Sequence, residues 1–99
     1  MLNISKKIEN TKAVLTLEGR LDTVTAPEME KVIREALPGL TELILDFKKL
    51  EYISSAGLRV LLLAQKAMNR QGKMKLCRVN ETIKEIFEVT GFSDILTIE

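Results

Sequence analysis

The chain has 99 residues, of which 45% are apolar and 29% charged, a balance typical of one globular domain and not of a disordered chain. Its 15 Lys and Arg residues and 14 Asp and Glu residues give a net charge of +1, so the chain as a whole has no electrostatic drive toward nucleic acid. It has no histidine and one cysteine, which excludes His-based nucleophile pairs, histidine-bearing zinc sites and a disulfide within the chain.

The same composition leaves few routes to catalysis. Acid–base chemistry near neutral pH would need a strongly shifted carboxylate or lysine in place of the missing imidazole. The longest apolar run, Val60 to Ala64, is too short to span a bilayer. Residues 1–7 lack the apolar core of a signal peptide. We therefore expect residues 1–99 to form one cytoplasmic domain that is not an enzyme and holds no metal or cofactor.

Two strands are predicted at the start of the chain. Leu2, Ile4 and Ile8 are thinly spaced apolar residues among lysines and polar residues, a pattern typical of an edge strand. Residues 13–17 (AVLTL) place apolar side chains on one face and predict a second, better buried strand. The alternation breaks at residues 19–22 (GRLD), where we expect a loop.

Thr25 begins the first predicted helix. Residues 25–28 (TAPE) have the form of a capping box, with proline in the first turn, where its missing N–H group is not needed. Apolar residues then recur at the spacing of one helical face: Met29, Val32, Ile33, Ala36 and Leu37. Residues 38–39 (PG) end the helix.

The middle of the chain predicts a central strand and a second helix. Residues 42–47 (ELILDF) contain three consecutive apolar residues, as expected for a strand covered on both faces. A turn through residues 48–50 leads to residues 52–55 (YISS). The second helix spans about residues 56–69 and is apolar around most of its girth, so it should be largely buried.

The last third of the chain predicts a strand, a helix and a short final strand. Met74 and Leu76 lie on one face of the strand. Asn80 is a typical N-cap for the third helix, which ends at Gly91. Residues 95–98 (ILTI) predict the final strand. The order β-β-α-β-α-β-α-β indicates a small α/β domain, with three main helices and a mixed, mostly parallel sheet of about five strands.

The first candidate site is the serine pair Ser54 and Ser55 at the start of the second helix, followed by the small residues Ala56 and Gly57. One serine can simply cap the helix, which is the commonest use of serine at that position. The other interpretation is phosphorylation. A phosphoryl group on Ser55 would add roughly −1.5 to −2 charges at a helix N-terminus, where free N–H groups and the helix dipole stabilise it.

The second candidate is the pair Asp22 and Thr23 in the loop after the second strand. Aspartate at such a position commonly stabilises its own loop. Alternatively, Asp22 lies close to Ser55 and orients its hydroxyl or repels the added phosphate, because both loops emerge at the same end of a parallel sheet. The residues alone leave both interpretations open.

The second helix is also basic. Arg59, Lys66 and Arg70 lie on it, and residues 55–70 contain no acid. A charge run of this kind is usually a solvated face, and a partner-facing patch is the alternative.

Three parts of the chain carry a family resemblance. Residues 19–22 (GRLD) followed by residues 26–27 (AP) are similar to a G-x-L-D stretch that precedes a first helix. Residues 43–46 (LILD) with residues 53–58 (ISSAGL) are similar to a strand and phosphoserine motif, which is the most specific of the matches. Residues 90–92 (TGF) and the closing ILTI complete the series. In this order they resemble the STAS domains, and among these the bacterial anti-sigma factor antagonists, over essentially the whole chain.

The resemblance implies a switch protein with the STAS fold. An unphosphorylated antagonist of this family binds an anti-sigma factor that is also an ATP-dependent serine kinase, and so frees the sigma factor. Phosphorylation separates the pair, and a metal-dependent phosphatase resets it. Alignment on residues 57–58 places the modified serine at Ser55. Ser54 is the second choice, because it stands where many members have Asp. Asp22 matches the family position that supports phosphorylation.

The resemblance also implies the partners. We expect a monomer that binds an anti-sigma factor serine kinase and a phosphoserine phosphatase, and that binds neither nucleic acid nor membrane. The alternative is a STAS interaction module of a larger signalling or transporter-accessory complex, whose binding does not depend on phosphorylation. The expected partner-binding residues are Asp22, Thr23, Ser54, Ser55, Ala56, Gly57 and Arg59.

Overall fold

Four strands and three helices make up the fold in a computed structural model that describes all residues, 1–99. The elements are β1 (Leu2–Glu9), β2 (Lys12–Leu21), α1 (Ala26–Ala36), β3 (Glu42–Ile53), α2 (Ser55–Gln71), β4 (Lys73–Cys77), α3 (Glu81–Thr90) and a 3-10 helix, η1 (Phe92–Asp94). The strands form one sheet in the order β1-β2-β3-β4. The pair β1/β2 is antiparallel, and β2, β3 and β4 are parallel. The predicted α/β class and the edge position of the first strand are confirmed. Strand β2 continues through residues 19–21, where a loop was expected, and the loop begins at Asp22.

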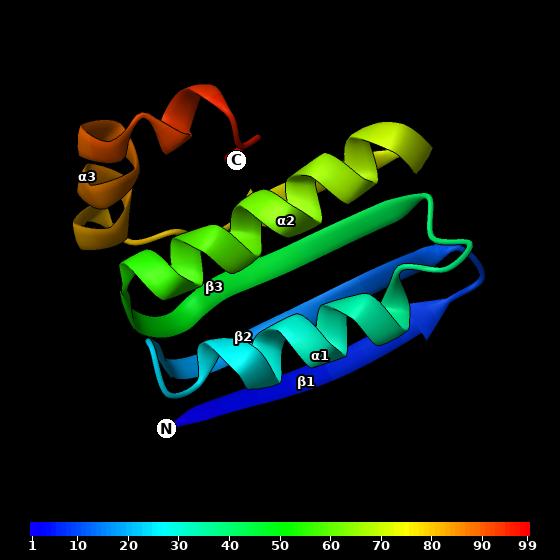
Figure 1. Cartoon of the computed structure of the whole chain (residues 1–99), viewed down its shortest axis with the longest axis horizontal. Coiled ribbons are helices and arrows are strands. Elements are labelled where there is room, and N and C mark those ends of the chain that lie inside the picture. The colour runs from blue at the N-terminus through cyan, green and yellow to red at the C-terminus, as the bar shows by residue number, and fades with distance from the viewer.

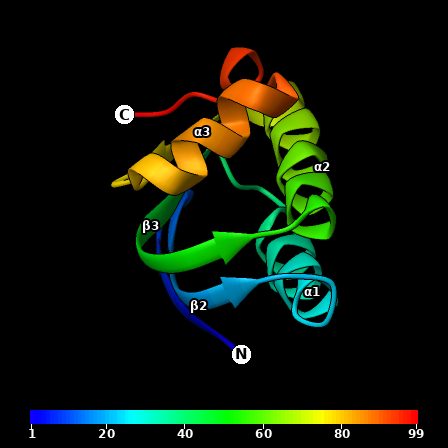
Figure 2. The same cartoon turned by 90° about the vertical axis from the view of Figure 1, so that its left-hand side faces the viewer.

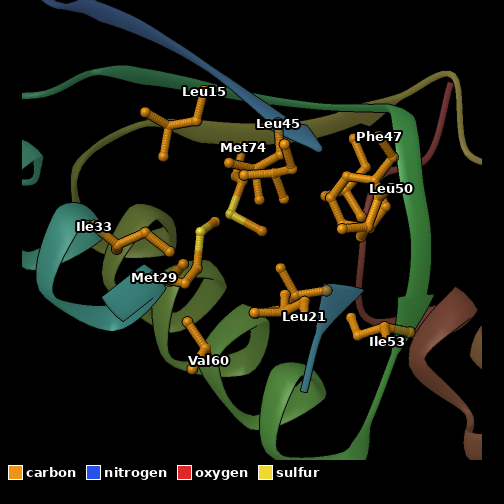
Figure 3. Packing of buried hydrophobic residues seen from close by; sticks show 14 of the residues in the cluster. Leu15, Leu21, Met29, Ile33, Leu45, Phe47, Leu50, Ile53, Val60 and Met74 are labelled. Carbon is orange, nitrogen blue, oxygen red and sulfur yellow. The ribbon is translucent and has the colours of Figure 1, made fainter. Parts of the chain in front are cut away.

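Helices α1 and α2 lie side by side on one face of the sheet (Figures 1 and 2). The strand order advances in one direction from β2 to β4, so two right-handed crossovers place both helices on the same face. Their apolar stripes close over the inward residues of the strands, with Leu15, Leu45 and Met74 above Met29 and Ile33 of α1 (Figure 3). None of the helices combines the length and hydropathy needed to cross a membrane.

The central strand differs from its prediction in two respects. Ile44 points away from α1 and α2 and is only half-buried, so the expected cover on both faces is wrong there. The strand also continues through residues 48–50, where a turn was expected. Phe47, Leu50 and Ile53 are all buried, at a spacing of three residues that a regular strand cannot place on one face. Register shifts against β2 in this stretch bend the strand and resolve the conflict.

The C-terminal segment replaces the predicted fifth strand. After η1, residues 95–99 meet β4 at a single parallel bridge between Leu76 and Ile98. The Leu76 N–H group donates to the Thr97 carbonyl at 2.9 Å, and its carbonyl accepts from Glu99 at 2.8 Å. The N–H groups of Ile95 and Leu96 bond back to the Phe92 carbonyl at 3.0 and 2.8 Å, so these two residues remain in the turn after η1 and no ladder forms. The sheet therefore has four strands and not about five.

The ends of α3 follow the sequence prediction. The Asn80 side chain accepts a hydrogen bond from the Ile83 N–H group at 2.9 Å and also donates to the Leu50 carbonyl at 3.0 Å. Gly91 ends the helix with φ 82°, a left-handed conformation that favours glycine. The bond from Asn80 to Leu50 ties the start of α3 to the bent part of β3, near the end of the sheet where α1 and α2 begin (Figure 2).

One carboxylate, Asp46, is buried in the sheet. It accepts hydrogen bonds from Arg78, at 3.1 Å from Nε and also from Nη2, and from the Lys48 N–H group at 3.0 Å. The guanidinium of Arg78 is the main cause that holds the pKa of Asp46 below its usual value. The ion pair ties the loop after β4 to the central strand.

We expect the Asp46→Asn variant to lose stability on the order of 1–3 kcal/mol at neutral pH, because it cannot hold the charge-assisted hydrogen bonds. The folded-state pKa of Asp46 lies below the ordinary value of 3.8. Its contribution is therefore complete above that pH and is lost as the pH falls through the folded-state value. Urea unfolding at a series of pH values should show the two proteins converging below about pH 4. A difference that stayed constant with pH would contradict this role.

Candidate functional site

The loops after β2 and β3 lie side by side at one end of the sheet, the end that faces the viewer in Figure 2. The parallel pairing of β2 and β3 continues past the register shifts to the last residues of both strands, where Leu21 is opposite Ile53. The Ser54 N–H group donates to the Leu21 carbonyl at 2.9 Å. Asp22 and Ser55 each stand one residue beyond that hydrogen bond, so the structure brings Asp22 beside the start of α2.

The two serines have different environments. Ser54 is the N-cap of α2, with extended backbone (φ −99°, ψ 177°), and its hydroxyl accepts from the Gly57 N–H group at 3.4 Å. Ser55 is the first helical residue, is exposed, and its hydroxyl makes no hydrogen bond within the chain. The sequence left open whether the serine pair caps the helix or offers a site for phosphorylation. In the structure Ser54 provides the cap and Ser55 has the free hydroxyl. The helix begins at Ser55, one residue earlier than predicted.

The first turn of α2 carries unsatisfied backbone donors. The N–H groups of Ser55 and Ala56 have no acceptor within the chain, whereas that of Leu58 bonds to the Ser54 carbonyl at 2.9 Å. No acidic side chain lies in this turn. Free N–H groups and the positive end of the helix dipole make the surroundings of the Ser55 hydroxyl favourable for an anionic group.

Gly57 fixes the position of this turn. A side-chain Cβ at residue 57 would lie 2.8 Å from carbon atoms of both Ile53 and Leu21, and 3.0 Å from the Leu21 carbonyl oxygen. The backbone at the start of α2 therefore packs in direct contact with the ends of β2 and β3. Only glycine, which has no Cβ, allows this close approach. Gly57 is buried, and its close contact with both strand ends fixes the position of the turn that carries Ser55.

Asp22 organises its own loop. Its Oδ1 atom accepts from the backbone N–H groups of Val24 at 3.0 Å and Thr25 at 3.1 Å. The Thr25 N–H bond is the main cause that lowers the pKa of Asp22, so the carboxylate is ionised at neutral pH. Its Oδ2 atom lies 3.7 Å from Nε of Arg20. The loop-stabilising interpretation is confirmed, and it leaves a fixed negative charge next to the start of α2.

Thr25 has a different role from the predicted one. Its hydroxyl does not cap α1; it accepts from the Asp22 N–H group at 2.9 Å and donates to the Arg20 carbonyl at 2.8 Å. The predicted capping box is wrong because these loop bonds occupy the Thr25 hydroxyl. The N–H group of Ala26, in the first turn of α1, donates instead to the Asp22 carbonyl at 2.8 Å. Thr25 is buried, and only the spacing of Asp22 and Thr25 in the sequence could have indicated this arrangement.

A stacked pair beside the loop was not expected. The Arg20 guanidinium lies 4.5 Å from the centre of the Tyr52 ring, a cation–π distance. The two residues are opposite each other in the β2/β3 register only because of the shift after Gly19. A register shift has no simple sequence pattern, so the stacking of Arg20 on Tyr52 could not be found from the sequence.

A groove runs between α1 and α2 from this end of the molecule. It has a volume of about 310 Å³. Three of the predicted partner-binding residues line it, namely Thr23, Ala56 and Arg59. Pro27 and Glu30 form the α1 side. Val24, in the adjacent loop, is 85% exposed.

Residues 3–99 match the family profile of the STAS domain. The match covers nearly the entire chain and includes both loops of the site. The chain therefore belongs to the STAS domain family, as the sequence resemblance indicated.

Named relatives agree with this assignment. BtrV of Bordetella bronchiseptica, named as an anti-sigma factor antagonist, is 34% identical over 87 residues, which cover 86% of this chain and 75% of the relative. The anti-sigma-B factor antagonist of Staphylococcus aureus is 27% identical over 99 residues, with 98% and 92% coverage. The fold is similar to that of the Bacillus anti-sigma factor antagonist SpoIIAA in its unphosphorylated form (TM-score 0.79, 19% identity, 98% and 87% coverage) and its phosphorylated form (TM-score 0.77, 19% identity, 98% and 91% coverage).

The two serines can be separated by matched substitutions. We expect Ser54→Ala to lower the free energy of unfolding by about 1 kcal/mol, because it removes the N-cap. Ser55→Ala should change it by less than about 0.5 kcal/mol, because no hydrogen bond is lost. Urea unfolding of the two variants measures the difference. Equal losses, or a larger loss for Ser55→Ala, would contradict the assignment of the cap to Ser54.

The hydroxyl of Thr25 should be needed for the loop. Thr25→Val keeps the shape of the side chain but leaves the Asp22 N–H group and the Arg20 carbonyl without their partner, so we expect a loss of about 1–3 kcal/mol. Thr23→Val makes the same exchange at an exposed neighbour and should stay within about 0.5 kcal/mol of the wild type. Thermal unfolding of both variants tests this, and similar losses would count against the buried hydroxyl.

Proposed function

We propose that this protein is an anti-sigma factor antagonist controlled by phosphorylation of Ser55. In the unphosphorylated form it binds an anti-sigma factor that is also a serine kinase, and so frees the sigma factor. The observation that carries the proposal is the exposed Ser55 hydroxyl, which is free of hydrogen bonds at the start of α2 while Ser54 provides the cap. The names of the relatives support the antagonist role.

The start of α2 can hold a phosphoryl group without losing its structure. The free N–H groups of Ser55 and Ala56 are available to phosphate oxygens, and the N-cap bond involves a different side chain. Arg59 follows Ser55 by four residues, a spacing that favours pairing between an anion and a cation on a helix. A residue at this position can therefore be modified without unfolding the helix, as a reversible switch requires.

The switch acts through charge and needs no conformational change. A phosphoryl group adds roughly −1.5 to −2 charges to a protein whose net charge is +1. In a closed interface, an unpaired charge costs several kcal/mol, which corresponds to a loss of affinity of about a thousandfold. The fixed carboxylate of Asp22 beside Ser55 adds to the negative potential that a bound partner would meet.

The remaining partner-binding residues have roles that follow from their positions. Asp22 orients the loop at the edge of the site, and Gly57 sets the position of the serine. Thr23, Ala56 and Arg59 line the groove into which a kinase contact would extend. A phosphoserine phosphatase would reach the same exposed end of α2 to reverse the modification.

The decisive experiment is mass analysis of this protein after incubation with ATP and each purified serine-kinase anti-sigma factor from its own genome. We expect one phosphoryl group on Ser55, no modification of Ser55→Ala, and modification of the matched Ser54→Ala control. Phosphate on Ser54 would keep the switch and move its position. No modification by any kinase would favour the alternative, a STAS interaction module whose complexes do not depend on ATP.

Binding measurements test the electrostatic part of the proposal. Calorimetric titration should show that Ser55→Ala binds the kinase and is not released by ATP, whereas Ser55→Asp should bind at least tenfold more weakly than wild type. Circular dichroism of each variant checks that the fold is unchanged. Wild-type affinity in the Ser55→Asp variant would refute control by charge at this position.

A further inference from the structure

We propose that the outward face of α2 is a second docking surface, which binds an acidic amphipathic helix of a protein partner. We call this surface the α2 stripe; it consists of Arg59, Leu62, Leu63, Lys66, Ala67 and Arg70, which line a groove of about 420 Å³. The inference goes beyond the proposed function, because binding to the stripe does not depend on whether Ser55 is phosphorylated or on the kinase.

The charge of the protein is strongly segregated around this helix. Residues 52–80 carry six basic and no acidic residues, while the rest of the chain carries nine basic and 14 acidic residues. A net charge of +1 therefore conceals a cationic segment in an otherwise acidic protein. A field of this kind attracts an acidic partner and orients it before contact.

The cations of the stripe have no partners within the chain. The ion pairs of the structure involve other basic residues: Arg20, Arg34, Lys75, Arg78 and Lys84. Arg59, Lys66 and Arg70 form none, and all three are exposed. Their spacing of seven and then four residues places them along one line of the helix, over about 16 Å. Three cations on this line match acidic side chains spaced by two turns and then one turn on a second helix.

Apolar side chains accompany these cations. Leu62, Leu63 and Ala67 are only half-buried, although most apolar residues of α2 are fully covered. An apolar strip next to a line of cations suits a helix with one apolar and one acidic edge. The apolar strip also distinguishes this partner from a nucleic acid, whose phosphate backbone would leave the leucine side chains uncovered.

The stripe is continuous with the site at the start of α2. Arg59 and Leu63 line both the groove between the two helices and the groove of the stripe. Figure 1 shows α1 beside α2 along this stretch, with both helices starting at the end that carries Ser55. A partner that contacts the serine can therefore extend a helix along α2 without crossing the sheet.

The test uses the whole protein as bait for a phage-displayed library of peptides about 16 residues long, which is enough for four helical turns. We expect the selected peptides to be acidic and amphipathic. On titration, the backbone amide signals of α2 should be the ones that shift in the NMR spectrum, and the affinity should fall as salt is raised. Peptides without an acidic bias, or shifts confined to another surface, would overturn the proposal.

Charge reversal supplies the matched control. The double variant Lys66→Glu/Arg70→Glu should bind the selected peptides at least tenfold more weakly, whereas Lys6→Glu/Lys7→Glu, an equal change on the exposed edge strand, should stay within about twofold. If the first variant does not fold, Lys66→Gln/Arg70→Gln replaces it. Equal losses in both variants would show a general charge effect and refute a specific surface.

Further controls separate the other occupants and the proposed function. A DNA duplex, vesicles with anionic lipid, or a second copy of the chain detected by sedimentation would each overturn the proposal if it occupied the α2 stripe in place of the peptides. Ser55→Ala should bind the peptides as tightly as wild type. A protein that no kinase modifies can still bind them, and loss of peptide binding leaves phosphorylation of Ser55 unaffected, so the two proposals fail independently.

Discussion

The parallel pairing of β2 with β3, maintained to the last residue of each strand, is the constraint on which the rest of the structure depends. It places Leu21 opposite Ile53 and allows Ser54 to bond to the Leu21 carbonyl. Gly57 then packs against both strand ends, which leaves the first turn of α2 no freedom to shift. A register slip of one residue would separate the two loops and turn the apolar side chains of β2 away from the helices.

Periodicity predicted most elements of the fold, because each helix shows its apolar stripe in the sequence and its end signals are local. Asn80 and Gly91 delimit α3 through contacts within a few residues of themselves. The failures concern long-range geometry. The bend of β3 depends on register shifts against β2, and residues 95–98 form no strand because only Ile98 pairs with β4. Neither effect can be recognised from the residues of the segment alone.

The candidate site shows the same division between local and distant causes. The sequence located both loops and both serines, because parallel strands deliver their ends to one edge. It could not assign the cap to Ser54, since adjacent serines at a helix start are equivalent until the backbone angles are known. The hydroxyl of Thr25 was misassigned to a cap for the same reason, because its partners Asp22 and Arg20 become neighbours only when the loop closes.

The rigidity of this end of the molecule determines how a switch could work here. Asp22 accepts hydrogen bonds from backbone N–H groups, and Thr25 is buried next to it. Gly57 packs α2 closely against the sheet. An added phosphate therefore has no flexible segment near it whose conformation it could change. Its effect must therefore act directly on whatever contacts the exposed surface. Lys66 and Arg70 of the α2 stripe lie beyond the modified turn, so a charge at Ser55 leaves these two cations free, while Arg59 lies four residues from the phosphate. In the proposed arrangement, phosphorylation weakens one end of an extended contact surface, and the contacts along the stripe set how much affinity remains.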